Sequence, residues 1–253
     1  MMTVSVSTFL RDNMPFDNIY STLILSQKVK EIEKLYNSQK NEFPAQEHKA
    51  YSLGTIYTLI GFLETSINDL FHNAKENFTG QLVGIEKHIA KLSTFEEDDI
   101  YNKLAKEIRD NIKPSILRKY QYALQLMEMT FIDVKDEKLV DLITLIYIRN
   151  SFIHHYATWR ECGSDTKSEY EELKGRFAEN PFYQDKGNPF FPEKLLGYGF
   201  LQWSIELSIR FVIEFYNKIG LQYTFMNRLE EKLEENNPSK IKEEENVHNL
   251  FNK

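Results

Sequence analysis

The sequence predicts an all-α protein, an antiparallel bundle of long helices. Glycine and proline are scarce, with 10 and 7 among 253 residues, so few turns are available and the elements must be long. Apolar residues recur at steps of three and four along several stretches, which is the spacing of a buried helix face. We therefore expect one helical-bundle domain over 1–225, followed by a charged tail over 226–253.

The first half of the chain contains two long predicted helices. The first covers 17–39. The second covers 45–78 and follows Pro44, a residue that suits the first turn of a helix. Its buried stripe comprises Ala50, Leu53, Tyr57, Ile60, Ile67 and Phe71. One position within this stripe is charged, and it is Glu64.

Two shorter helices are expected next. Thr94 and Glu97 have the spacing of a capping box, which predicts a helix over 95–112. Its apolar positions are Ile100, Leu104, Ile108 and Ile112. A helix over 115–129 follows the chain break at Pro114.

The second half begins with a predicted helix over 136–157. Its stripe comprises Leu139, Leu142, Ile146 and Ile153, and the position that completes this stripe is Arg149. Residues 158–191 contain scattered glycines and prolines, which predicts an irregular excursion with one short helix near 166–177. A strongly apolar helix over 192–220 completes the bundle and ends at a glycine.

Composition limits the classes of function. A net charge of −7 and a pI of about 5.5 argue against a broad basic surface for duplex DNA. The single cysteine, Cys162, cannot form an internal disulfide, which favours a reducing cytoplasm. Residues 1–16 lack the apolar core of a signal peptide, and no stretch has the length and composition of a membrane span.

No cofactor or metal is expected. The sequence has no glycine-rich phosphate loop and no pair of histidines at metal-binding helical spacing. The acidic run at 96–99 falls in the first turn of a predicted helix. Acidic side chains are favourable there because the positive end of the helix dipole is close. We therefore interpret this run as structural.

Arg149 is the first candidate functional residue. A charge on a buried stripe is costly unless it is paired or reaches a solvated cleft. Two explanations are open: an ion pair between Arg149 and Glu64 that joins two helices, or an anion-binding cleft. They are compatible, because a carboxylate can hold one side of a guanidinium while the other side binds phosphate.

Asn150, His154 and His155 follow Arg149 closely. His154 is five residues after Arg149, about 140° around a helix and about 7.5 Å along it. Both side chains could therefore reach one cleft near the helix end. Asn150 and His154 are four residues apart and can form a hydrogen bond that orients the imidazole. Histidine near a helix C-terminus is more commonly only a dipole partner, but two in succession beside Arg149 favour a site.

The segment Arg149-Asn150-x-x-x-His154 resembles the signature of the HEPN superfamily. In that family of helical-bundle proteins, an arginine is followed after four to six residues by a histidine. His155 also satisfies the spacing, so either histidine fits. An upstream helix with an acidic residue facing the motif, as Glu64 on 50–71 is expected to be, is also similar to the family. The resemblance covers about 45–220, without the excursion.

The resemblance implies a metal-independent endoribonuclease that leaves a 2′,3′-cyclic phosphate. Catalytic members act on RNA, are often toxins or antiviral effectors, and commonly work as dimers that bring two motifs together. It implies catalytic roles for Arg149, His154 and Asn150, with His155 and Glu64 as further candidates. An antitoxin or another regulatory protein is an expected partner.

Two other functions remain open at this point. The first is a catalytically silent HEPN-like module whose Arg149 cluster binds a nucleotide or a protein partner. The second is an adaptor or structural subunit unrelated to the family. Asn-Pro-Phe occurs at 180–182 and again at 188–190 and could serve as a ligand for an adaptor domain, although Asn-Pro is generally a turn.

Overall fold

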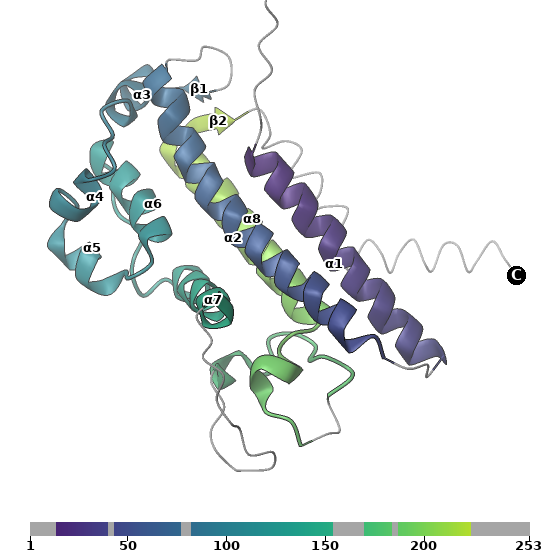
Figure 1. The fold of residues 1–253 in the computed structure, drawn as a ribbon. Helices are drawn as coiled ribbons and strands as arrows, with labels where there is room; N and C mark the ends of the chain where they lie inside the picture. Colours follow the sequence, from purple (N-terminus) through teal and green to yellow (C-terminus); the bar gives the residue numbers. More distant parts are fainter. Residues whose placement is uncertain (1–13, 40–42, 77–81, 154–169, 184–186, 224–253) are drawn as a thin grey trace, which may run out of the picture.

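The structure is a computed structural model that describes residues 14–39, 43–76, 82–153, 170–183 and 187–223. Over these residues the fold is an all-α bundle, as predicted (Figure 1). Its helices are α1 (Met14–Gln39), α2 (Ala45–Glu76), α3 (Glu86–Leu92), α4 (Asp99–Asn102), α5 (Lys106–Asn111), α6 (Ser115–Leu126), α7 (Glu137–Ile153) and α8 (Tyr198–Ile219). The strands are β1 (Leu82–Gly84) and β2 (Leu221–Tyr223), and there are irregular turns at Glu171–Leu173 and Phe190–Lys194. None of the helices in these ranges is long and apolar enough to cross a membrane.

Three long helices, α1, α2 and α8, lie side by side in the bundle (Figure 1). β1 follows the end of α2, β2 follows the end of α8, and the two strands pair with each other. The C-terminal ends of α2 and α8 therefore meet, so these helices run in the same direction, and α1 runs opposite to both. The expectation of a wholly antiparallel bundle is wrong for this pair. In the sequence, helices α3 to α7 lie between α2 and α8, and they bring the chain back to the end of the bundle at which α2 begins.

The buried face of α2 differs from the predicted stripe. Ile60 and Ile67 are buried as expected, but Ala50 is exposed and Tyr57 is 39% exposed. The predicted stripe advances by about 3.5 residues per turn, whereas a straight α-helix advances by about 3.6, so the stripe drifts around a long helix. Glu64 consequently lies at the edge of the buried face, with 44% of its side chain exposed.

The predicted helix over 95–112 is wrong, because the chain forms α4 and α5 there with a turn between them. Thr94 does not cap a helix start. Its hydroxyl donates to the backbone oxygen of Lys91 at 2.7 Å, just after α3. The apolar residues recur at steps of four, and each step adds about 40° of rotation around a helix. Two short helices allow the four predicted apolar residues of this stretch to face the core. All are buried: Ile100, Leu104, Ile108 and Ile112.

The last long helix starts later than predicted. Pro192 belongs to the turn at Phe190–Lys194, and Gly197, in an extended conformation, immediately precedes α8. The predicted end is confirmed, since Gly220 has φ +66°, a left-handed conformation that glycine adopts readily. Of the short helix expected near 166–177, the described part contains only the 3₁₀ turn at Glu171–Leu173. Residues 166–169 lie outside the described ranges.

Candidate functional site at the end of α7

The predicted motif begins in the last turns of α7. Arg149 and Asn150 are both half-buried there. The described part of α7 ends at Ile153. The candidate histidines, His154 and His155, lie outside the described residues, so their position relative to Arg149 stays a prediction.

The guanidinium of Arg149 has no acidic partner within 4 Å among the residues that the structure describes. Its Nε atom is enclosed by protein and donates no hydrogen bond. An enclosed donor without an acceptor costs free energy, and a guanidinium that is short of partners attracts an anion. The anion-binding explanation for the charge at this position stays a prediction.

The predicted Arg149–Glu64 ion pair is wrong. The Glu64 carboxylate lies 4.0 Å from the Nζ atom of Lys119 on α6. Lys119 is 7% exposed, and its Nζ also donates to Asn68 at 2.8 Å and lies 3.3 Å from a carboxylate oxygen of Glu97. A buried ammonium needs such compensation, and the nearest cation to Glu64 among the described residues is on α6.

Tyr170 and Phe191 lie against the end of α7 that carries the motif. The Ser151 hydroxyl is 2.8 Å from the Tyr170 hydroxyl, which joins the two segments. The rings of Phe152 and Phe191 have centroids 5.2 Å apart, and Tyr170 packs edge-on against Phe191 at 5.0 Å. The described residues of the predicted excursion thus pack beside the motif. Its aromatic residues are the signal that could have indicated this.

An ion pair fixes the same segment to the first half of α7. Nη1 of Arg176 lies 2.6 Å from Oδ1 and 2.7 Å from Oδ2 of Asp141. Burial raises the pKa of the Asp141 carboxyl, and the Arg176 guanidinium acts in the opposite direction. Segment 170–176 is therefore attached to α7 at two points, at Ser151 close to Arg149 and at Asp141 in the first half of the helix.

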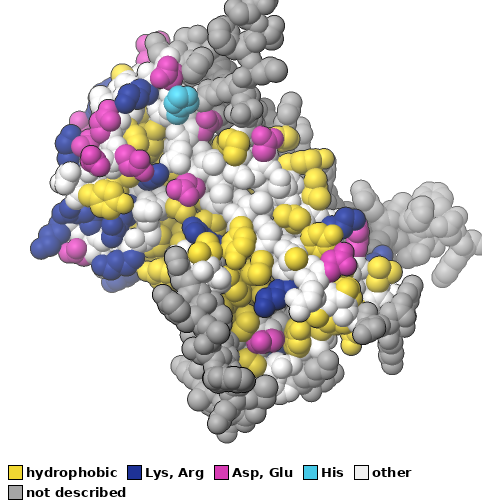
Figure 2. Space-filling model, in the orientation of Figure 1, with side chains coloured by type: hydrophobic (Ala, Val, Ile, Leu, Met, Phe, Trp, Pro, Cys, Tyr) yellow, Lys and Arg dark blue, Asp and Glu magenta, His cyan; other side chains and the backbone are white. Residues whose placement is uncertain are grey.

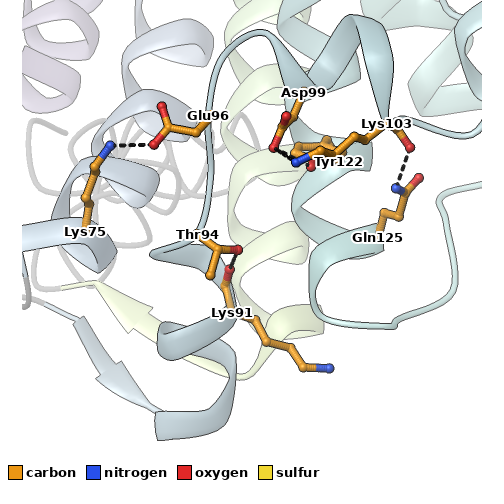
Figure 3. A network of polar contacts seen from close by, with 8 residues as sticks. All are labelled: Lys75, Lys91, Thr94, Glu96, Asp99, Lys103, Tyr122 and Gln125. Atoms are coloured by element: carbon orange, nitrogen blue, oxygen red, sulfur yellow. Dashed lines mark hydrogen bonds and ion pairs between the residues drawn. The ribbon is translucent and has the colours of Figure 1, made fainter.

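The acidic run at 96–99 ends at the start of a helix, as predicted, because Asp98 is the N-cap and Asp99 lies in the first turn of α4. Ion pairs also hold the run in place. Lys75 binds Glu96 at 2.9 Å, and Lys103 binds Asp99 at 3.0 Å (Figure 3). Tyr122 donates its hydroxyl to Asp99 at 3.2 Å. Lysines from α2 and from the turn after α4 therefore hold these acids, which attaches α4 to its neighbours. Among the described residues, no group of three or more His, Cys, Asp or Glu side chains is placed to hold a metal ion.

Charge is distributed unevenly over the face shown in Figure 2. Acidic and basic side chains crowd the side formed by α3 to α5, whereas hydrophobic side chains gather in the middle of the face. On α7 itself, Val140 is 44% exposed and Tyr147 is 38% exposed. A predominantly basic surface, of the kind that would bind nucleic acid non-specifically, is not visible on this face.

Comparison of the chain with protein-family models, with curated proteins and with solved structures finds no match to any of them.

Proposed function

We propose that the protein is a metal-independent endoribonuclease of the HEPN type. The observation that supports this proposal most directly is the Arg149 guanidinium, which is half-buried at the end of α7 and has no carboxylate partner among the described residues. A cation of this kind is suited to a phosphodiester. The type of reaction, cleavage of RNA without a metal ion, is inferred from the resemblance of Arg149-Asn150-x-x-x-His154 to the HEPN signature.

The proposed reaction requires only proton transfer and charge stabilisation. The 2′-hydroxyl of RNA attacks the adjacent phosphorus and loses its proton to His154. The bond from phosphorus to the 5′ oxygen breaks, and that oxygen takes up a proton, which leaves a 2′,3′-cyclic phosphate. Arg149 holds the anionic phosphorane in two-point contact, and Asn150 orients the imidazole.

The remaining features of the proposal concern assembly and affinity. One motif supplies one histidine and one arginine, so a homodimer that brings two motifs together would provide both an acid and a base. With a net charge of −7, binding of RNA is expected to be local to the motif and modest in affinity. A toxin or antiviral role in the cytoplasm, controlled by an antitoxin or another regulatory protein, belongs to the same proposal.

The test is cleavage of mixed single-stranded RNA by the purified protein in excess EDTA. The variants are Arg149→Ala, His154→Ala and His155→Ala, and the last decides which histidine is used. Arg210→Ala is the matched control, because the Arg210 side chain is 58% exposed and its ion-pair partner among the described residues is Glu206 on the same helix. Circular dichroism confirms that each variant is folded, and sedimentation measures the oligomeric state.

We expect cleavage that survives EDTA, is abolished by Arg149→Ala and by one of the two histidine changes, and is unchanged by Arg210→Ala. A requirement for a divalent ion, or equal activity in all variants, would refute the proposal. If the wild-type protein cleaves no RNA, titration with a nucleotide tests the silent module. Binding that depends on Arg149 but not on Arg210 would then support that function.

A further inference from the structure

A separate cavity lies at the opposite end of α2 from the strands. Its volume is about 190 Å³, and its walls come from the first turn of α2, from residues 180–183 and from the turn that precedes α8. It is far larger than a single water molecule needs. It is smaller than the pockets of roughly 300–1,000 Å³ that hold drug-sized ligands. The cavity therefore suits a small molecule.

Hydrogen bonds between elements hold the walls in place. His48 is 3% exposed, and its Nε2 lies 2.9 Å from Oε1 of Glu33 on α1. The same oxygen of Glu33 accepts the backbone N–H of Tyr198 at 2.8 Å. Asn180 donates its side-chain amide to the backbone oxygen of Leu196 at 2.6 Å. Three helices and the excursion are thereby joined around a cavity that exists before any ligand binds.

Glu193 is the acidic residue among those that line the cavity. Its Oε2 atom is enclosed by protein and accepts no hydrogen bond, and the carboxylate has no ion pair with any residue that the structure describes. The Glu193 residue as a whole is half-buried, so the charge that both oxygens share has no partner from the described part of the protein. Lys49 also lines the cavity, but it is exposed and forms no ion pair with Glu193. A positively charged ligand within the cavity would provide the compensating charge for the Glu193 carboxylate.

We propose that this cavity binds a small organic cation with N–H donors, a primary ammonium or a guanidinium, through the carboxylate of Glu193. Tyr183 and His48 also line the cavity. Leu196 and Pro192 provide apolar surface for a short aliphatic chain. The ligand class is therefore a short aliphatic amine or guanidine. This site is independent of the Arg149 motif.

The test is calorimetric titration of the full-length protein with putrescine, agmatine and 1,4-butanediol. The last compound has the length of putrescine but no charge. The variants are Glu193→Gln, which removes the charge with little change in shape, and Glu193→Asp, which keeps it. Lys49→Gln is the matched control, because it removes a cation from the same wall. Thermal melting establishes that each variant is folded.

We expect putrescine or agmatine to bind at least tenfold more tightly than 1,4-butanediol. Glu193→Gln is expected to lower that affinity at least tenfold, while Glu193→Asp retains most of it. Removal of the competing positive charge in Lys49→Gln leaves the affinity unchanged or raises it a few fold. Four results would each overturn the proposal: no saturable binding, equal affinity for the neutral diol, wild-type affinity in Glu193→Gln, or loss of binding in Lys49→Gln.

Discussion

Replacement of Arg176 by methionine tests whether the segment beside the motif is held to α7 by charge. Asp141 is 7% exposed, and two of its oxygens lie within 2.7 Å of the Arg176 guanidinium. Loss of one partner from a fully buried pair costs about 3–5 kcal/mol, and an exposed pair contributes about 0–1 kcal/mol. Because the Arg176 side chain is 33% exposed, we expect Arg176→Met to lower the free energy of unfolding at pH 7 by about 2 kcal/mol.

The pH dependence of this loss has a definite sign. Burial raises the pKa of Asp141, and removal of Arg176 takes away the group that opposes this effect. The folded-state pKa of Asp141 in the variant is therefore further above its value in the unfolded chain. Stability of the variant falls as the pH rises from the unfolded pKa through the folded pKa. The difference from wild type should thus be largest at neutral pH and smaller near pH 4.

Urea unfolding followed by circular dichroism measures these differences. Asp141→Asn and the double variant complete a thermodynamic cycle, in which the double variant should lose less than the sum of the two single changes. A loss below about 0.5 kcal/mol for Arg176→Met, the ordinary range for surface substitutions, would show that the pair does not hold the segment. A loss that is equal at pH 7 and pH 4 would show that Asp141 is not the group responsible.

Three further changes test other parts of the structure. Burial and Asp99 raise the pKa of Tyr122 to about 12, so the free energy of unfolding should fall as the pH rises above about 10. In urea unfolding at alkaline pH, Tyr122→Phe should make this fall shallower by up to about 1.4 kcal/mol per pH unit. A Cβ at position 199 would lie 2.4 Å from a backbone oxygen, whereas one at position 187 has no atom within 4 Å. Gly199→Ala should therefore lower the melting temperature clearly and Gly187→Ala should not, and equal melting temperatures would contradict the packing. Glu64→Ala should cost less than about 1 kcal/mol in urea unfolding, because Glu64 is half-exposed and lies 4.0 Å from its partner.

Local signals predicted the long helices well. Pro44 and Pro114 each directly precede a helix, and Gly220 ends the last one. These residues act through their own backbone conformation, so their effect can be read without knowledge of the rest of the fold. Thr94 shows the limit of such signals. The same hydroxyl that could cap a following helix bonds instead to the helix before it, and only the packing of the surrounding apolar residues selects between the two.

The sequence predicts the burial of Arg149 but not which charged residue Glu64 contacts. The helical period placed Arg149 on the buried side of its helix, and the structure finds it half-buried at the end of α7. The period identifies a face but does not indicate which faces meet. The sequence pairs Glu64 with Arg149 because each is the only charge in its predicted apolar stripe. Lys119, which the structure buries within α6, was not recognised as the nearer cation.

The distribution of compensated charge distinguishes structural groups from candidate binding groups in this fold. Lys119 and Asp141 are each buried, and each has charged partners within 4 Å, so their charges stabilise contacts between helices. Within the described ranges, Arg149 and Glu193 are the charged residues with an enclosed side-chain atom that lacks a hydrogen bond. Their charges are opposite, one at the end of α7 and the other in the turn that precedes α8. Binding of an anionic ligand should therefore depend on Arg149 and not on Glu193, and binding of a cationic ligand on Glu193 and not on Arg149. If substitution of one of these two residues abolished both kinds of binding in a folded protein, the two sites would not be independent.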